Sequence, residues 1–154
     1  MTGGRCVLRT DGGARGNPGP AGAGFVLADA NGARICGGGR FLGETTNNIA
    51  EYEALLWGLR SARARGCEML TVYSDSELVV KQLNGQYRVK HPNMQPLYAK
   101  ACSLLAQFRD VKVVHVRREE NAEADALANQ AMDARETVGD ADDPCVDVQA
   151  TLFD

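Results

Sequence analysis

The sequence lacks long apolar runs and has few aromatic residues and few cysteines. No apolar run approaches the ~20 residues that a membrane-spanning helix needs, which excludes a transmembrane helix. The first residues lead into a predicted strand without the apolar region of a secretory signal peptide. The five cysteines lie far apart and form neither a CxxC pair nor a Cys/His cluster, which argues against a zinc site. We therefore expect a protein of a reducing, cytoplasmic compartment.

The charged residues are distributed unevenly along the chain. The formal net charge is -3, but residues 133–154 hold seven acidic residues and one arginine. Residues 1–132 hold 16 basic and 13 acidic residues, a net charge of +3. A mildly basic body can bind a polyanion such as nucleic acid, with modest and salt-sensitive affinity.

The length of 154 residues fits one compact domain with a tail. We expect the domain to cover residues 1–133 and an acidic C-terminal tail to cover residues 134–154. Within that tail, residues 136–148 are polar and aperiodic, which predicts a flexible segment. The composition, 44% hydrophobic and 24% charged, is ordinary for a globular protein.

Apolar periodicity and turn residues predict five strands and four helices. The strands are expected at 5–10, 22–29, 33–42, 69–74 and 111–116. The helices are expected from the Thr45–Asn48 region to about Arg65, and at 76–84, 95–108 and 121–132. Three meandering strands followed by strand–helix alternation predict an α/β fold with a mixed sheet and helices on its faces.

Four carboxylates lie in apolar stretches of the sequence, where burying a charged side chain costs free energy. Asp11 and Asp75 each follow an apolar strand-like run, and Glu51 and Asp125 lie near the starts of otherwise apolar helical patterns. Acids that converge from distant parts of a chain repel one another unless a divalent cation neutralises them. For any one of them the structural alternative is a turn or helix-cap residue, for which Asp75 before Ser76 is the clearest case. Together they indicate a metal-dependent enzyme that acts on phosphates.

The segments around these acids resemble the four motifs of type 1 ribonuclease H, in that family's order. They are Thr10-Asp11-Gly12-Gly13 with Gly16-Asn17-Pro18-Gly19-Pro20, Thr45-Thr46-Asn47-Asn48-Ile49-Ala50-Glu51, Tyr73-Ser74-Asp75-Ser76, and Asn121-Ala122-Glu123-Ala124-Asp125. The resemblance covers about residues 5–132. It implies a mixed five-stranded sheet in the order 3-2-1-4-5 with helices on both faces. It also implies endonucleolytic hydrolysis of the RNA strand of RNA–DNA hybrids.

By this resemblance, Asp11, Glu51, Asp75 and Asp125 would hold two Mg²⁺ ions, or Mn²⁺ in their place, with Asp11 bridging them. Two-metal phosphodiester hydrolysis places such ions roughly 3.5–4 Å apart across the scissile phosphate. The catalytic metal set would be complete only with oxygens from the substrate and water, because Mg²⁺ takes few protein ligands.

The resemblance also implies a substrate-binding set that reads the 2′-hydroxyls of the RNA strand and a phosphate of the DNA strand. Its members are Gly12, Gly13, Asn17, Thr46, Asn47 and Asn48. Helix capping is the structural alternative for the asparagine pair, and turn geometry is the alternative for the glycines.

Two features depart from many members of that family. The region 84–92 is short and holds only Arg88, Lys90 and His91 where relatives have a basic helical handle, so we expect weaker hybrid binding. The loop before Asp125 also lacks the mobile histidine of many relatives. Arg118 is the preferred substitute as a permanent cation near the scissile phosphate. His115 is expected to be a strand residue.

The C-terminal residues Gln149, Leu152 and Phe153 resemble the short motif by which bacterial replication proteins bind the sliding clamp. The alternative is a tail that folds back onto its own domain. We expect a monomer that binds an RNA–DNA hybrid and no membrane. Two other functions stay open: a non-catalytic hybrid-binding or adaptor domain, and a different nuclease on the same fold.

Overall fold

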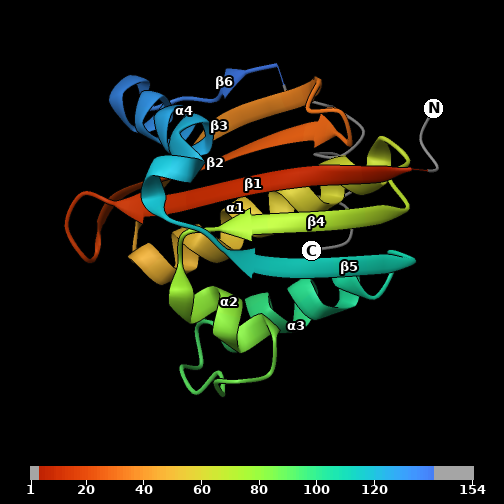
Figure 1. Ribbon diagram of the computed structural model, residues 1–154. Coiled ribbons are helices and arrows are strands. Elements are labelled where there is room, and N and C mark those ends of the chain that lie inside the picture. Colours follow the sequence, from red (N-terminus) through yellow and green to blue (C-terminus); the bar gives the residue numbers. More distant parts are fainter. Residues whose placement is uncertain (1–3, 141–154) are drawn as a thin grey trace.

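The computed structural model describes residues 4–140 and contains a six-stranded mixed sheet in the order β5-β4-β1-β2-β3-β6 (Figure 1). Strands β1, β2 and β3 form an antiparallel meander, and β4 and β5 run parallel to β1. The predicted order 3-2-1-4-5 is confirmed. The strands are β1 (Arg5–Ala14), β2 (Gly19–Asp29), β3 (Arg34–Thr45), β4 (Met69–Ser74), β5 (Asp110–His115) and β6 (Val138–Gly139).

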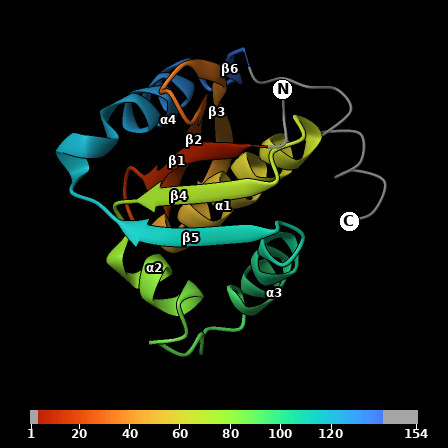
Figure 2. The same ribbon diagram turned by 45° about the vertical axis from the view of Figure 1, so that its right-hand side comes forward.

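The helices cover both faces of the sheet. Helix α1 packs on β1 and β2 with α3 beside it, and α4 packs on the opposite face over β2 and β3 (Figure 2). The helices are α1 (Asn47–Ala64), α2 (Glu77–Leu83), α3 (Gln95–Leu105) and α4 (Ala122–Ala134), the last preceded by a 3-10 turn, η1 (Arg118–Asn121).

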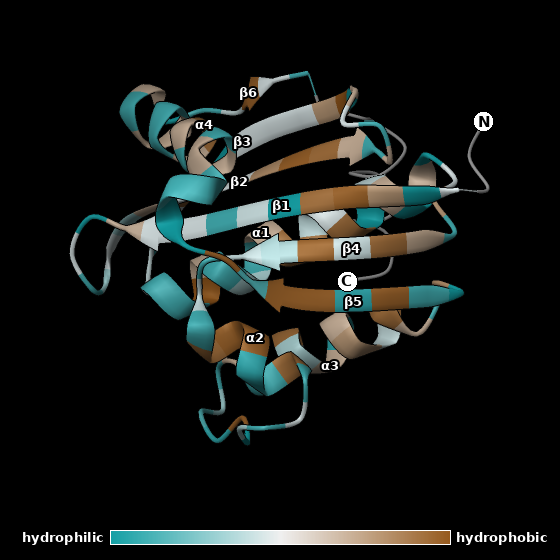
Figure 3. Cartoon of the chain, in the orientation of Figure 1, coloured by the Kyte–Doolittle hydropathy of each residue, from teal (hydrophilic) through white to brown (hydrophobic). Residues whose placement is uncertain are grey.

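The main core lies between the sheet and α1. Leu8, Phe25 and Leu55 are almost fully buried there, and Phe25 meets Trp57 edge to face with ring centroids 4.8 Å apart. Figure 3 shows the apolar residues along the central strands and polar residues on the loop between α2 and α3. Among the described residues, no helix is long and apolar enough to cross a membrane.

Strand β1 is longer than predicted, and Asp11 lies inside it rather than after it. Asp11, Gly12 and Gly13 stay paired with Gly24, Ala23 and Gly22 of β2. Glycine is required at position 12, because a Cβ there would collide with the backbone of Ala50 in α1. This close approach brings the metal-ligand motifs of β1 and α1 together.

The sheet also has a sixth strand that the sequence did not predict. Val138 and Gly139 pair with Gly39 and Gly38 at the edge of β3, within the segment that was assigned to the tail. The Asp140 carboxylate then accepts a hydrogen bond from the Gly37 amide at 2.8 Å. Such a short strand has too few residues to show a periodic pattern. The predicted clamp-binding residues Gln149, Leu152 and Phe153 lie outside the described residues.

Cys6 and Cys67 form a disulfide that differs from the expectation of reduced thiols. Cys6 lies on β1 and Cys67 lies just before β4, and these two strands are parallel neighbours. Their Cα atoms are 6.0 Å apart, a spacing that a disulfide spans. Their separation of 61 residues in the sequence hid this proximity.

Candidate active site

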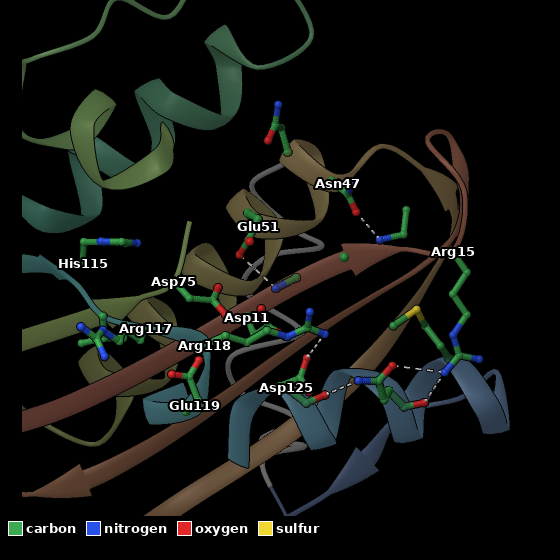
Figure 4. A pocket seen from close by; sticks show the side chains of 17 residues that line it. Asp11, Arg15, Asn47, Glu51, Asp75, His115, Arg117, Arg118, Glu119 and Asp125 are labelled. Atoms are coloured by element: carbon green, nitrogen blue, oxygen red, sulfur yellow. Dashed lines mark hydrogen bonds and ion pairs between the residues drawn. The ribbon is translucent and has the colours of Figure 1, made fainter. Parts of the chain in front are cut away.

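Three of the predicted acids meet at the carboxyl ends of β1 and β4. Asp11 lies on β1, Asp75 directly follows β4, and Glu51 projects from α1 (Figure 4). Each contributes one carboxylate oxygen to a cluster whose oxygens all lie within 4.8 Å of one another. The parallel pairing of Thr10 with Ser74 explains why Asp11 and Asp75 are neighbours.

Local capping interactions leave these acids available. The Thr46 hydroxyl caps α1 by accepting a hydrogen bond from the Ile49 amide at 3.3 Å. Ser76 caps α2 in the same way, by accepting a hydrogen bond from the Val79 amide. The capping role considered for Asp75 is therefore filled by Ser76. One oxygen of Glu51 accepts a hydrogen bond from the Gly12 amide at 3.0 Å, which fixes its direction.

Asp125 stands beside this cluster rather than in it. It lies in the first turn of α4, where its proximity helps to raise the pKa of Asp11, and the three-acid cluster does not include it. Its Oδ1 is 3.6 Å from Nη2 of Arg118, a side chain that is 77% exposed. The fourth acid therefore has a cation as its second partner.

The proximity of the acids perturbs their protonation. Burial, with the charges of Glu51 and Asp75, raises the pKa of Asp11 to about 9. Burial, with the charge of Asp75, raises the pKa of Glu51 to about 8, and the hydrogen bond from Gly12 opposes this shift. At neutral pH these carboxyl groups stay protonated unless a cation binds close enough to stabilise their ionised form.

The cluster fits a hard divalent cation. Carboxylate oxygens are the protein ligands that Mg²⁺ and Mn²⁺ accept, and the three oxygens converge from three elements. A bound cation would replace the protons that Asp11 and Glu51 retain because of their raised pKa values. Asp11, Glu51 and Asp75 could hold it, with Asp125 next to Asp11.

A cleft of about 760 Å³ contains the acids. Of the predicted substrate-binding residues, Gly12, Gly13, Asn47 and Asn48 line it. Asn17 and Thr46 do not line it. Two basic residues of the predicted loop, Arg117 and Arg118, and His115, the last residue of β5, also face this cleft.

Asn17 and Asn47 also connect the loop between β1 and β2 to the start of α1. The Asn47 side-chain oxygen accepts a hydrogen bond from the Ala14 amide at 2.6 Å, and the Asn47 amide donates to the Asn17 side chain at 3.1 Å. Thr46 makes the side-chain cap of α1, and Asn47 and Asn48 are the first residues of the helix, so the capping alternative for this pair is not what the structure shows. The loop and the start of α1 therefore form one connected edge of the cleft.

Several cleft or neighbouring residues were missed by the sequence analysis. Arg15, Asn129 and Met132 line the cleft. Asn121 occupies the N-cap position of α4, but its buried side chain donates to the Thr10 carbonyl at 2.7 Å and makes no capping hydrogen bond. The spacing of four residues between Asp125 and Asn129 could have revealed Asn129, because such residues share a helix face.

The fold and the acid cluster define the class of nucleic-acid-processing domains built on the ribonuclease H fold. The family described as reverse transcriptase-like matches residues 9–131. Ribonuclease HI of Halobacterium salinarum is 43% identical over 85% of this chain and 66% of its own length. Ribonuclease H of Hydrogenovibrio crunogenus is 34% identical over 82% of this chain and 94% of its own length. The chain belongs to the ribonuclease H family, and its relatives of high identity are of type 1.

Solved structures agree. The N-terminal ribonuclease H domain of Rv2228c from Mycobacterium tuberculosis superposes with a TM-score of 0.83 at 44% identity, covering 84% of this chain and 94% of that chain. LC11-RNase H1, solved in complex with an RNA/DNA hybrid, gives 0.81 at 41% identity, covering 84% and 98%. This chain spans only 39% of the length of the full bifunctional Rv2228c protein, to which it is 43% identical over 90% of its own residues.

Proposed function

We propose that this protein hydrolyses the RNA strand of RNA–DNA hybrids in a metal-dependent reaction. The observation that carries the proposal is the cluster of Asp11, Glu51 and Asp75 within 4.8 Å at the floor of an open cleft. Membership in the ribonuclease H family supports it, as does the relative solved with an RNA/DNA hybrid. A binding module would gain nothing from keeping mutually repelling carboxylates.

We assign the metal-binding role to Asp11, Glu51, Asp75 and Asp125, with Mg²⁺ as the preferred ion and Mn²⁺ as a substitute. When bound, two such ions activate the attacking water and stabilise the leaving 3′ oxygen. We assign the central position to Asp11 because its carboxyl group lies beside Glu51 and Asp75 and its pKa responds to Asp125 as well. Glu51 is held in place by the Gly12 amide, so it presents its second oxygen to the cleft.

The cleft's rim supports the choice of substrate. Asn48 and the backbone at Gly12 and Gly13 line the cleft beside the acids, where amide and peptide groups can pair with 2′-hydroxyls. Thr46 and Asn17 would act from the adjoining loop and helix start. Arg118 adds a permanent positive charge near Asp125 that suits a scissile phosphate.

Cleavage of end-labelled duplexes tests the proposal. The protein with Mg²⁺ should cut an RNA–DNA hybrid in its RNA strand and leave RNA–RNA and DNA–DNA duplexes intact, and a chelator should abolish cutting. Binding of the hybrid without cleavage under any divalent metal would instead establish an adaptor. Cutting of duplex DNA would establish a different nuclease on the same fold.

Narrower predictions accompany this proposal. We propose that the protein acts as a monomer in the cytoplasm and that Gln149, Leu152 and Phe153 bind a sliding clamp. A clamp-binding assay with Leu152→Ala/Phe153→Ala tests the last point, and absence of binding by the intact chain would refute it. Alkylation of thiols at the moment of lysis tests the compartment: alkylated Cys6 and Cys67 would fit the cytoplasm, whereas an intact Cys6–Cys67 disulfide would contradict it.

A further inference from the structure

Arg15 joins the loop between β1 and β2 to helix α4 across one side of the cleft. Its Nη1 lies 2.7 Å from Oδ1 of Asp133, and its Nη2 lies 3.2 Å from Oδ1 of Asn129 and 3.5 Å from the Asn129 carbonyl. Asp133 and Asn129 are one helical turn apart. The planar guanidinium therefore binds two successive turns of α4 through two different nitrogens. Lysine has a single nitrogen and cannot reproduce this geometry.

Both ends of this bridge continue into the proposed active site. On the helix side, the Asn129 side chain donates to the Asp125 carbonyl at 3.0 Å. On the loop side, Ala14 donates to Asn47, and Asn47 donates to Asn17. The bridge thus lies between the turn of α4 that carries Asp125 and the segment that carries the proposed substrate asparagines (Figure 4).

We propose that Arg15 is a positioning residue that holds the β1–β2 loop against α4, so that the substrate-reading asparagines keep a constant distance from Asp125. This inference rests on the proposed function and deepens it. Arg15 acts through Asn129 and Asp133 rather than through the substrate.

A simple phosphate contact is the competing role for an arginine on the rim of a nucleic-acid cleft. The geometry opposes it, because both terminal nitrogens of Arg15 already bind α4 and its guanidinium is paired with the carboxylate of Asp133. The two roles predict opposite effects of Asp133→Asn. Removal of a negative charge from the rim would tighten hybrid binding if Arg15 bound a phosphate. It would weaken binding if the bridge positions the loop.

Steady-state cleavage of an RNA–DNA hybrid by the full chain tests the proposal. We expect a rise in KM of about 3–10-fold, with kcat changed less than about twofold, for each of Arg15→Ala, Arg15→Lys and Asp133→Asn. A rise of this size corresponds to the interaction energy that residues in one polar network usually share. The double variant Arg15→Ala/Asp133→Asn should be no worse than either single variant. The slope of log KM against log salt concentration should stay that of the wild type.

Hydrogen exchange provides a readout that does not depend on activity. The Arg15 amide donates to the Pro20 carbonyl at 2.8 Å, so loosening of the loop should speed its exchange in all three variants. Arg34→Ala is the matched control. Nη1 of Arg34 lies 3.3 Å from Oε2 of Glu123 in α4, and this pair is not part of the cleft lining. That control should leave both KM and the exchange of the Arg15 amide unchanged.

Three outcomes would overturn the proposal. One is tighter hybrid binding by Asp133→Asn. Another is full rescue by Arg15→Lys together with a salt slope for Arg15→Ala that is smaller by about one, which marks a lost phosphate contact. The third is a wild-type chain that neither binds nor cuts the hybrid, which would refute the proposed function as well. In the first two outcomes the wild-type chain still cuts the hybrid, so the failures are distinguishable.

Discussion

The two ends of the sheet treat carboxylates in opposite ways. At the end where β1 and β4 reach the cleft, Asp11 and Glu51 face other acids, and their pKa values are raised. At the other end, hydrogen bonding from Arg5 lowers the pKa of Asp110. The Gly37 amide and Arg34 likewise lower the pKa of Asp140. One end brings acids together and the other pairs Asp110 and Asp140 with donors, so the electrostatic cost lies where a ligand can relieve it.

The largest expected effect comes from neutralising the central acid of the cleft. Asp11→Asn should lower the rate of hybrid cleavage by about three orders of magnitude or more, because loss of a metal ligand removes several kcal/mol of charge stabilisation. It should also raise the melting temperature of the metal-free protein at pH 8, because folded Asp11 must keep its proton there while the unfolded chain releases it, and asparagine carries no such cost. Cleavage assays and thermal unfolding in chelator measure the two effects.

Asp110→Asn is the matched control at the other end. It removes an acid that pairs with Arg5, so it should leave cleavage unchanged and lower the melting temperature slightly. Equal effects of the two substitutions on stability would contradict the contrast between the two ends.

The next largest effect concerns the covalent link at the end opposite the cleft. Cys67→Ser should destabilise the oxidised protein by about 2–4 kcal/mol, because the disulfide closes a long loop. Cleavage at 25 °C should stay normal, since the link lies far from the acids. Cys102→Ser, which removes a partly exposed free thiol, is the control. A Cys67→Ser protein as stable as wild type under non-reducing conditions would show that the pair contributes nothing.

The pH dependence of the metal-free protein should follow the raised pKa values. Folded Asp11 and Glu51 retain protons up to about pH 9 and 8, whereas in the unfolded chain they lose them near their ordinary values. The stability that these groups contribute is therefore complete below their ordinary pKa values and is lost progressively as pH rises from there to about 8 for Glu51 and 9 for Asp11. Melting temperatures from pH 5 to 9 should fall in chelator. Added Mg²⁺ should recover much of the loss at pH 8–9, and a flat profile would exclude the predicted repulsion.

The smallest expected effect comes from the anchor of β6. Asp140→Asn should lower stability by less than about 1 kcal/mol, because its partner Arg34 is partly exposed and water screens the pair. Chemical denaturation would measure this change, with Asp29→Asn compared in the same way. Loss of cleavage in Asp140→Asn would show that this end of the sheet communicates with the cleft, contrary to expectation.

Much of the fold was predictable because its signals are local. The alternation of apolar residues predicted the bounds of β4 without error, and α1 begins within the predicted Thr45–Asn48 region. The strand order followed from the resemblance of the motifs around Asp11, Glu51 and Asp75. Strand β6 was missed because its two residues pair only where α4 and β3 bring them together.

The sequence by itself indicated the family and singled out the four acids as candidate ligands, since each motif is a short run of neighbouring residues. Only the tertiary structure decided that Asp125 stands outside the three-acid cluster, that Cys6 meets Cys67, and that Arg15 bridges to α4. These contacts join residues between 61 and 118 positions apart, or depend on distances of a few ångströms across the sheet. No periodicity or spacing along the chain records such distances, because they arise when the strands pair and the helices pack.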